Sequence, residues 1–273
     1  MPSIREFFNK TVDPHVRGYL HEPESSNGSG LVLTHGAGSN ANAPLLVALA
    51  ETFCDHGFSV LRCDLPYRQT RSFGPPGPAD GARDRAGLKN AIAELRKTLD
   101  FSVNDGIQSG AQGKIFLGGH SYGGRQSSML CAELSEKKDS EGASSDASFV
   151  GWESIAGLLL LSYPLHPPRK PEQQRTQHLP NLHTPTLFVS GSRDPFGSIA
   201  EIEQALKMIP ARTKLVTIEG AGHDLGFKAK ASKGKAKKQE ELEGTTTKEG
   251  KTRKVDLPDK IYSDFIGFFT LLS

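Results

Sequence analysis

The sequence predicts an α/β protein, with a mostly parallel central sheet and helices on both of its faces. Three observations support this prediction. Short apolar runs typical of buried strands alternate with amphipathic helical segments along most of the chain. Glycine-rich turns directly follow several of these runs. The chain has 273 residues, which is enough for one domain of this class with its own core.

The elements follow one another in a regular order. The predicted strands cover residues 30–34, 58–63, 114–118, 155–162, 185–190 and 213–218, and residues 16–20 could add an edge strand. The predicted helices cover residues 44–56, 80–99, 122–134, 198–209 and 258–271. Five prolines between Pro164 and Pro180 exclude a regular helix there, so no large helical lid is expected.

Two polar segments interrupt this order. We expect a single domain over residues 1–273, with flexible insertions at about 135–148 and 228–254. The second insertion holds nine Lys and one Arg against four Glu, a net charge of +6. We interpret it as a solvated loop, while a protein or polyanion partner is the alternative.

Composition limits the classes of partner and compartment. The net charge is only +2, so nucleic acid is an unlikely partner, and no apolar run is long enough to span a membrane. The N-terminal residues lack the apolar stretch of a signal peptide. Cys54, Cys63 and Cys131 show no framework spacing and are interpreted as reduced thiols. A cytoplasmic location is expected, with weaker indications of a nuclear one.

One motif carries the chemistry. Gly119–Gly123 is a G-x-S-x-G between a predicted strand and a predicted helix. In that setting the turn is sharp and exposes the hydroxyl of Ser121 at the carboxyl end of the sheet. A Cβ at Gly119 or Gly123 would clash where the strand and the helix nearly touch. Ser121 is therefore the candidate nucleophile.

A serine nucleophile needs a base, and the base needs a carboxylate. His223 follows a predicted strand inside the turn Gly220–Gly226, and is the best candidate base. Asp194 follows another strand and lies between Ser121 and His223 in sequence, so it is the candidate acid; Asp224 is the competing choice. His120, next to the nucleophile, is expected to point into the sheet.

The remaining groups are assigned by position. The backbone N–H groups of Ala37 and Tyr122 are the expected oxyanion donors. The expected pocket-lining side chains are His35, Tyr67, Arg68, Tyr163, His166 and Phe196. The histidines lack metal-ligand spacing, and the turn after residue 34 lacks the phosphate-loop pattern, so we expect neither a metal nor a cofactor.

Taken together, HGAGSN, GGHSYGGR, YPLHPP, GSRDPFG and GAGHDLGF resemble the α/β-hydrolase superfamily over nearly the whole chain. More narrowly, they resemble a small dienelactone-hydrolase-like family that includes testis-expressed protein 30 and the hydrolase-like domain of a chromatin acetyltransferase (NSL) complex subunit. The resemblance implies that Ser121, Asp194 and His223 act as nucleophile, acid and base, and that Arg125 matches a basic residue common in that family.

Two functions remain open from the sequence. The leading one is a serine hydrolase that cleaves a carboxylic ester or thioester of a small acyl substrate through an acyl-enzyme on Ser121. The alternative is a non-catalytic scaffold or protein-interaction module built on the same fold.

Overall fold

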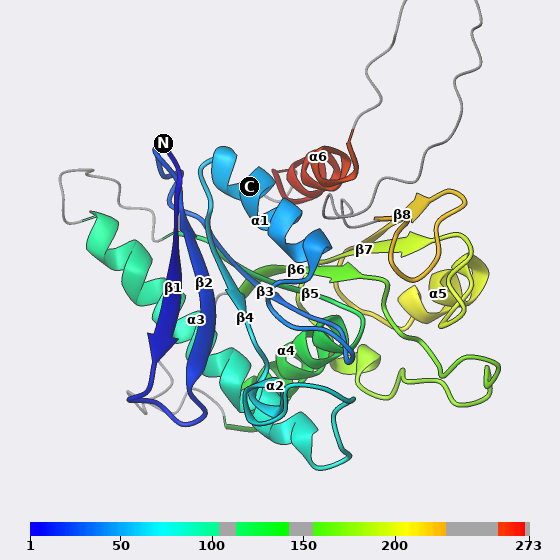
Figure 1. Ribbon diagram of the computed structural model, residues 1–273. Helices are drawn as coiled ribbons and strands as arrows, with labels where there is room; N and C mark the ends of the chain where they lie inside the picture. The colour runs from blue at the N-terminus through cyan, green and yellow to red at the C-terminus, as the bar shows by residue number, and fades with distance from the viewer. Residues whose placement is uncertain (104–112, 142–154, 228–255, 271–273) are drawn as a thin grey trace, which may run out of the picture.

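A computed structural model of the protein describes residues 1–103, 113–141, 155–227 and 256–270. An eight-stranded sheet crosses the molecule in the order β1-β2-β4-β3-β5-β6-β7-β8 (Figure 1). Its strands are β1 (Ser3–Asn9), β2 (Val16–Glu22), β3 (Gly30–Thr34), β4 (Ser59–Cys63), β5 (Ile115–His120), β6 (Ile155–Leu161), β7 (Thr186–Gly191) and β8 (Thr213–Ile218). The strands from β3 to β8 are parallel, and β2 is antiparallel to both of its neighbours.

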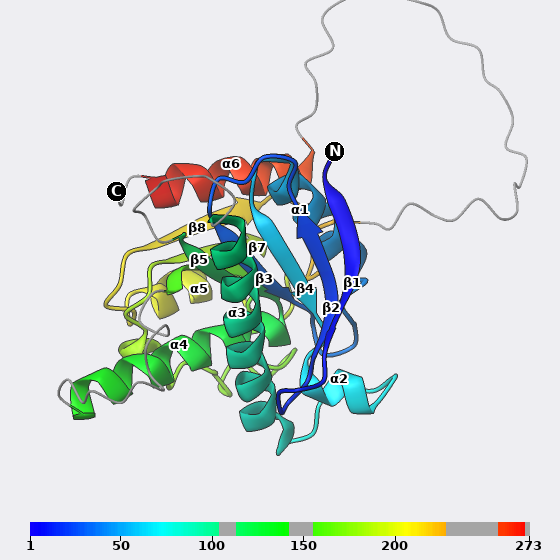
Figure 2. The same ribbon diagram turned by 90° about the vertical axis from the view of Figure 1, so that its left-hand side faces the viewer.

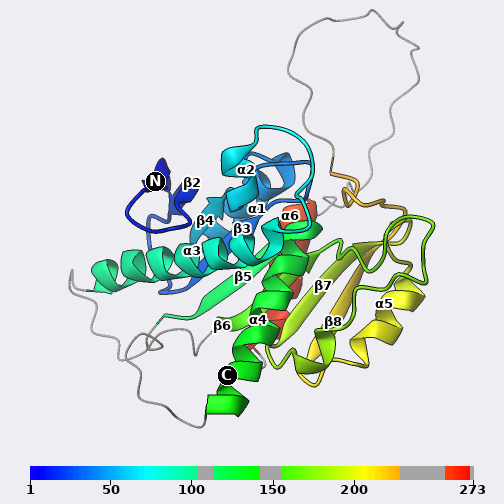
Figure 3. The same cartoon turned by 90° about the horizontal axis from the view of Figure 1, so that it is seen from below.

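Helices cover the two faces of this sheet. They are α1 (Pro44–Asp55), α2 (Pro66–Thr70), α3 (Asp80–Val103), α4 (Tyr122–Glu141), α5 (Ile199–Leu206) and α6 (Leu257–Thr270). The helices α1 and α6 pack on one face (Figure 2). The helices α3, α4 and α5 cross the other face (Figure 3). The predicted α/β architecture is confirmed.

The central strand β6 explains why both faces need cover. Leu158 and Leu160 pack toward α3, α4 and α5, while Leu159 and Leu161 pack toward α1 and α6. All four side chains are fully buried. Successive side chains of a strand point to opposite faces, so a continuous apolar run requires a layer on each side.

Several elements differ from the sequence prediction. The edge strand is β1, which was not predicted, and β2 lies between β1 and β4 instead of at the edge. The short helix α2 interrupts the predicted loop over residues 64–78. Helix α4 continues to Glu141, so the first part of the predicted insertion 135–148 is helical. The rest of that insertion and the lysine-rich segment 228–254 lie outside the described residues.

The topology brings the chemically interesting turns together. His35, Ser121, Asp194 and His223 each follow the carboxyl end of a parallel strand. Carboxyl ends of parallel strands meet at one edge of a sheet, which is where ligands bind in open α/β sheets. Within the described parts of the chain, no helix combines the length and the apolar character needed to cross a membrane.

Candidate active site

Ser121 forms the link between β5 and α4. Its φ is 51°, in the left-handed region that is costly for a residue with a Cβ. Its N–H donates to the carbonyl oxygen of Leu161 on the neighbouring strand at 2.8 Å, and its own carbonyl accepts from Arg125 N–H at 3.0 Å. These bonds hold the strained turn at the edge of the sheet.

The two outer glycines of the motif make this turn sterically feasible. A Cβ at Gly123 would lie 2.2 Å from Thr34 Oγ1 and 2.6 Å from the carbonyl oxygen of His35. A Cβ at Gly119 would lie 2.7 Å from the backbone of Gly123. Such separations are far below van der Waals contact, so the predicted close approach of strand and helix is confirmed.

Ser121, His223 and Asp194 form a hydrogen-bonded chain. Ser121 Oγ is 2.8 Å from His223 Nε2, and His223 Nδ1 is 2.8 Å from Asp194 Oδ2. A carboxylate only accepts hydrogen bonds, so Nδ1 carries the proton and the lone pair of Nε2 faces the serine hydroxyl. The Asp194 side chain is 2% exposed, whereas the His223 ring is 22% exposed. The ring can therefore be reached from the pocket while its carboxylate partner is shielded from water.

The environment of the two aspartates decides which of them pairs with the histidine. Asp194 also accepts a hydrogen bond from the N–H of Phe196 at 2.9 Å, which fixes the carboxylate below the imidazole. Asp224 Oδ1 instead accepts from the N–H of Gly226 at 3.0 Å and caps its own turn. The competing assignment of Asp224 therefore does not match the structure.

Ala37 and Tyr122 both lie close to Ser121. A Cβ at Gly36, next to Ala37, would be 3.4 Å from Ser121 Cβ, so this turn directly adjoins the serine. Tyr122 is the first residue of α4, and the first N–H groups of a helix have no intrahelical partner. Both residues line the pocket that contains Ser121.

Three of the predicted pocket-lining residues lie behind the pocket. Arg68 is buried and donates hydrogen bonds to the carbonyl oxygens of Ser39 at 2.7 Å and Ala37 at 2.9 Å. The Tyr67 hydroxyl donates to Ala37 O at 2.8 Å. His35 is fully buried and lies 2.9 Å from Gly36 O. The prediction that these side chains line the pocket is wrong. Their polar groups instead form hydrogen bonds with the backbone of the turn that contains Ala37.

Two further predictions fail for a similar reason. The Tyr163 hydroxyl donates to the carbonyl oxygen of Arg175 at 2.8 Å and also contacts the side chains of Ser128 and Arg125. His166 Nδ1 donates to Pro167 O at 2.8 Å, and its Nε2 lies 3.5 Å from Glu201. Neither residue lines the pocket. Only Phe196 does so among the six, with its ring centroid 4.1 Å from that of His223.

His120 does not point into the sheet as predicted. Its ring lines the pocket, and its Nε2 lies 2.8 Å from the carbonyl oxygen of His223. Since that carbonyl can only accept, Nε2 carries the proton. Burial lowers the pKa of His120, and the hydrogen bond to His223 O partly opposes this effect. The neutral ring therefore anchors the backbone of the candidate base.

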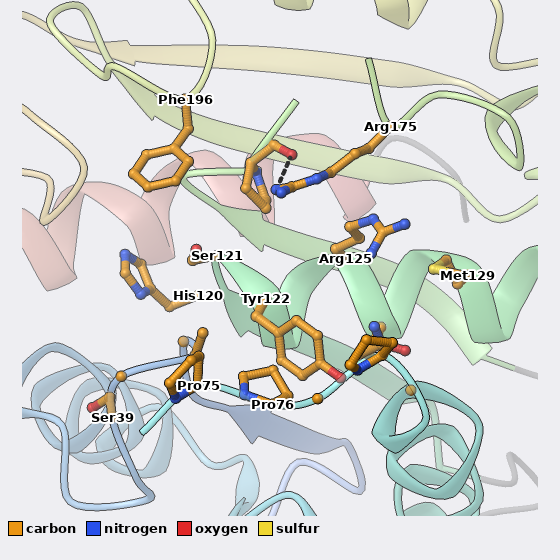
Figure 4. Close-up of a pocket in the computed structure, with 18 of the residues that line it drawn as sticks. Ser39, Pro75, Pro76, His120, Ser121, Tyr122, Arg125, Met129, Arg175 and Phe196 are labelled. Atoms are coloured by element: carbon orange, nitrogen blue, oxygen red, sulfur yellow. Dashed lines mark hydrogen bonds between the residues drawn. The ribbon is translucent and has the colours of Figure 1, made fainter. Parts of the chain in front are cut away.

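The pocket has a volume of about 1010 Å³ (Figure 4). Much of its wall was not predicted from the sequence and comes from three separate segments. The loop before α3 supplies three prolines, α4 supplies Arg125 and Met129, and the loop after β6 supplies Pro164 and Arg175. The position of Arg125 could have been predicted, because a residue one helical turn after Ser121 lies on the same face of the helix.

Tyr122 is held at the pocket by a buried carboxylate. Its hydroxyl donates to Asp84 Oδ2 at 2.7 Å, and the N–H of Tyr67 donates to Asp84 Oδ1 at 3.0 Å. Burial raises the pKa of Asp84, although these two hydrogen bonds oppose the effect. Asp84 thus connects the Ser121 turn to α2 from below.

Solved structures with the same fold include several hydrolases. A dienelactone hydrolase from Anabaena variabilis has a TM-score of 0.58 at 22% identity, covering 82% of this chain and 89% of that chain. A putative dienelactone hydrolase from Klebsiella pneumoniae has a TM-score of 0.62 at 12% identity, covering 99% of both chains. A serine hydrolase without a lid from Xanthomonas campestris has a TM-score of 0.52 at 13% identity, covering 82% of this chain and 87% of that chain. At identities this low, the TM-scores establish a shared fold and nothing about a shared activity.

Sequence comparison adds one local similarity and one that covers most of the chain. The polyketide synthase ThaQ of Burkholderia thailandensis is 48% identical over 48 residues, which is 18% of this chain and only 2% of that protein. The alpha/beta hydrolase domain family matches residues 27–249, from the first parallel strand to beyond His223. The chain therefore belongs to the alpha/beta hydrolase domain family.

Proposed function

We propose that this protein is a serine hydrolase that cleaves a carboxylic ester or thioester through an acyl-enzyme on Ser121. The observation that carries the proposal is the unbroken hydrogen-bonded chain from Ser121 Oγ through His223 to Asp194. A serine hydroxyl is almost un-ionised at neutral pH, so it attacks a carbonyl only when a base removes its proton. His223 Nε2 is in contact with this hydroxyl, and the Asp194 acceptor at Nδ1 favours the tautomer whose Nε2 can take the proton.

The reaction proceeds in two halves. Ser121 Oγ attacks the acyl carbonyl carbon while His223 Nε2 takes the hydroxyl proton. His223 then gives this proton to the leaving alcohol or thiol as the bond to the acyl carbon breaks. Water enters, and His223 removes its proton while the water oxygen attacks the acyl carbon. His223 then gives this proton to Ser121 Oγ as the acyl–oxygen bond breaks, which releases the acid and restores the serine hydroxyl. Asp194 keeps the imidazole in the required tautomer and stabilises its positive charge.

The charge that forms on the carbonyl oxygen needs donors on the far side from His223. The N–H groups of Ala37 and Tyr122 are assigned this role, because both residues line the pocket that contains Ser121. Backbone donors fixed before the reaction stabilise the tetrahedral intermediate without further rearrangement.

The motifs also support a narrower grouping. We place the chain with the dienelactone-hydrolase-like group that includes testis-expressed protein 30 and the NSL-complex hydrolase-like domain. The support is the set of five sequence motifs, three of which contain Ser121, Asp194 and His223.

The deciding experiment is labelling with a fluorophosphonate probe, which reacts only with an activated serine. Wild type should be labelled and Ser121→Ala should not, with equal circular dichroism spectra. Ser25→Ala, which removes a hydroxyl from an exposed loop, is the matched control and should be labelled like wild type. Well-folded wild type that resists the probe would reject the hydrolase and favour the scaffold.

A further inference from the structure

The pocket around Ser121 has an uneven charge. Three arginines line it, Arg85, Arg125 and Arg175, and no Asp or Glu is among its described lining residues. His120 and Phe196 lie beside Ser121 on one side of the pocket, and Arg125 and Arg175 lie on the other side, with the guanidinium of Arg175 turned toward Pro164 (Figure 4). The cavity therefore has a reactive side and a cationic side.

One of the three arginines is already neutralised. Arg85 Nε lies 2.7 Å from a carboxylate oxygen of Glu133, and Arg85 Nη1 donates to Gln126 Oε1 at 2.9 Å. Its charge is satisfied within the protein. The positive potential of the pocket must come from the other two.

Neither Arg125 nor Arg175 pairs with a carboxylate in the described part of the chain, although the guanidinium of Arg125 contacts the neutral hydroxyl of Tyr163. Among the described residues, no carboxylate lies within 4.0 Å of either guanidinium. Arg125 Nε is buried and has no hydrogen-bond partner in the described part of the chain. Within the described residues, Arg175 Nη1 makes only a 3.3 Å contact with the carbonyl oxygen of Pro164. A buried donor without a partner is costly, so these groups are well disposed toward a ligand that accepts hydrogen bonds.

The two cations also act on each other and on their surroundings. The pKa of Arg175 is lowered, first by burial and then by the positive charge of Arg125. Burial, together with the charges of Arg125 and Arg85, lowers the pKa of His178 to about 4. His178 thus stays neutral beside α4 and adds no competing charge. An anion placed between the two guanidiniums would remove their mutual repulsion.

The position of Arg125 sets the distance to the reacting carbonyl. Arg125 follows Ser121 by four residues at the start of α4, about 6 Å along the helix axis. Tyr122 and Met129 line the same stretch and offer apolar contact. A ligand that spans both sides needs a short apolar linker between its carbonyl and its charged group.

We infer that Arg125 and Arg175 form an anion-binding subsite that selects esters or thioesters bearing a carboxylate or phosphate several bonds from the scissile carbonyl. The inference rests on the proposed function, since the carbonyl is placed at Ser121. Planar guanidiniums bind carboxylate and phosphate oxygens in pairs, and such charge-assisted hydrogen bonds are among the strongest in proteins.

Hydrolysis of two matched esters tests this selectivity. Mono-(p-nitrophenyl) adipate carries a carboxylate at the end of a six-carbon acyl chain, and p-nitrophenyl hexanoate has the same length without charge. Wild type should favour the adipate ester in kcat/KM by about tenfold or more at low salt. Arg125→Gln and Arg175→Gln should each reduce this preference about tenfold, and Arg125→Lys should retain part of it.

Arg169→Gln is the matched control, because it removes the same charge from an exposed position in the same loop as Arg175. It should leave the preference unchanged. Hydrolysis of the hexanoate ester with no preference for the adipate ester would overturn the inference while leaving the proposed hydrolase intact.

A binding measurement tests the anion-binding subsite independently of the proposed hydrolase activity. Calorimetry with adipate and with inorganic phosphate, on wild type and on Arg125→Gln, measures the subsite without any reaction. At least one of the two anions should bind wild type and lose about tenfold in affinity in the variant, and their ranking tells carboxylate from phosphate. Binding without hydrolysis of either ester would reject the proposed function and support the anion site. Absence of binding by both anions would overturn the inference.

Discussion

His35 Nδ1 lies 2.9 Å from the carbonyl oxygen of Gly36 and donates a hydrogen bond to it. In a trans peptide the carbonyl and the following N–H point in opposite directions. Fixing Gly36 O on the buried side therefore turns the N–H of Ala37 toward the pocket. The N–H of Leu65 donates to His35 Nε2 at 3.1 Å, which requires a neutral ring. Burial favours that state, because it lowers the pKa of His35.

This relationship predicts that His35 is a positioning residue. His35→Phe keeps the ring volume but removes the bond to Gly36 O, so the Ala37 donor should lose its orientation. We expect kcat for p-nitrophenyl hexanoate to fall by about ten- to a hundredfold, with a much smaller change in KM. His183→Phe, at an exposed histidine, is the control. An unchanged kcat in a folded His35→Phe would contradict the assignment of Ala37 as an oxyanion donor.

The pairing of His223 with Asp194 predicts that substitution of Asp194 is far more damaging than substitution of Asp224. Asp194→Asn removes the acceptor that fixes the imidazole tautomer, and kcat should fall by roughly three to four orders of magnitude. Asp224→Asn can still accept from the N–H of Gly226, and its kcat should stay within a fewfold of wild type. Steady-state kinetics on both variants decides the question, and comparable losses would refute the choice of Asp194.

The left-handed backbone at Ser121 predicts a stability difference between two inactive variants. At φ 51° a residue with a Cβ is strained by about 1–2 kcal/mol, and glycine escapes this strain at an entropic cost of about 0.5–1 kcal/mol. Ser121→Gly should therefore exceed Ser121→Ala in free energy of unfolding by up to about 1 kcal/mol. Urea denaturation of the two proteins measures the difference, and a more stable Ala variant would argue against strain.

His21 predicts a specific pH dependence of stability. Arg62 Nε donates to His21 Nε2 at 2.8 Å, so the ring must be neutral when folded. Burial, aided by the charge of Arg62, lowers the pKa of His21 from 6.5 to about 4. Between these values the unfolded state binds a proton that the folded state does not. Stability is therefore present above pH 6.5 and is lost as pH falls toward 4, by up to about 3 kcal/mol.

His21→Gln keeps an acceptor for Arg62 and cannot titrate. Chemical denaturation at pH 4 to 7 should give a flatter profile for His21→Gln than for wild type, with the exposed His183→Gln as control. Profiles that run parallel would exclude His21 as a source of the acid sensitivity.

The parallel part of the fold follows from patterns that are local in sequence. The run Leu158–Leu161 is apolar at every position, which is possible only for a strand covered on both faces. The strand β1 was not predicted. Most of its side chains are exposed, on both faces of the strand, so it lacks the alternation of buried and exposed residues that identifies a strand. Its place comes from pairing with β2, a contact between segments that the pattern does not encode.

The candidate site also has parts that follow from local sequence patterns and parts that depend on tertiary contacts. The order Ser121, Asp194, His223 and the position of each after a strand were readable from the sequence, because strand ends and glycine turns are local signals. Whether a side chain near a strand end faces the pocket or the backbone behind it depends on packing. That is why His35, Tyr67 and Arg68 were misplaced.

The fold class, the sharp turn at Ser121 and the three hydrogen-bonded residues could all be identified from local sequence patterns. The character of the pocket could not, because it depends on how distant segments pack together. Arg125 and Arg175 come from α4 and from the loop after β6, fifty residues apart in sequence, and they meet because β5 and β6 are adjacent in the sheet. Uncompensated charge is a property of three-dimensional neighbours, so it emerges only when the strands are placed side by side.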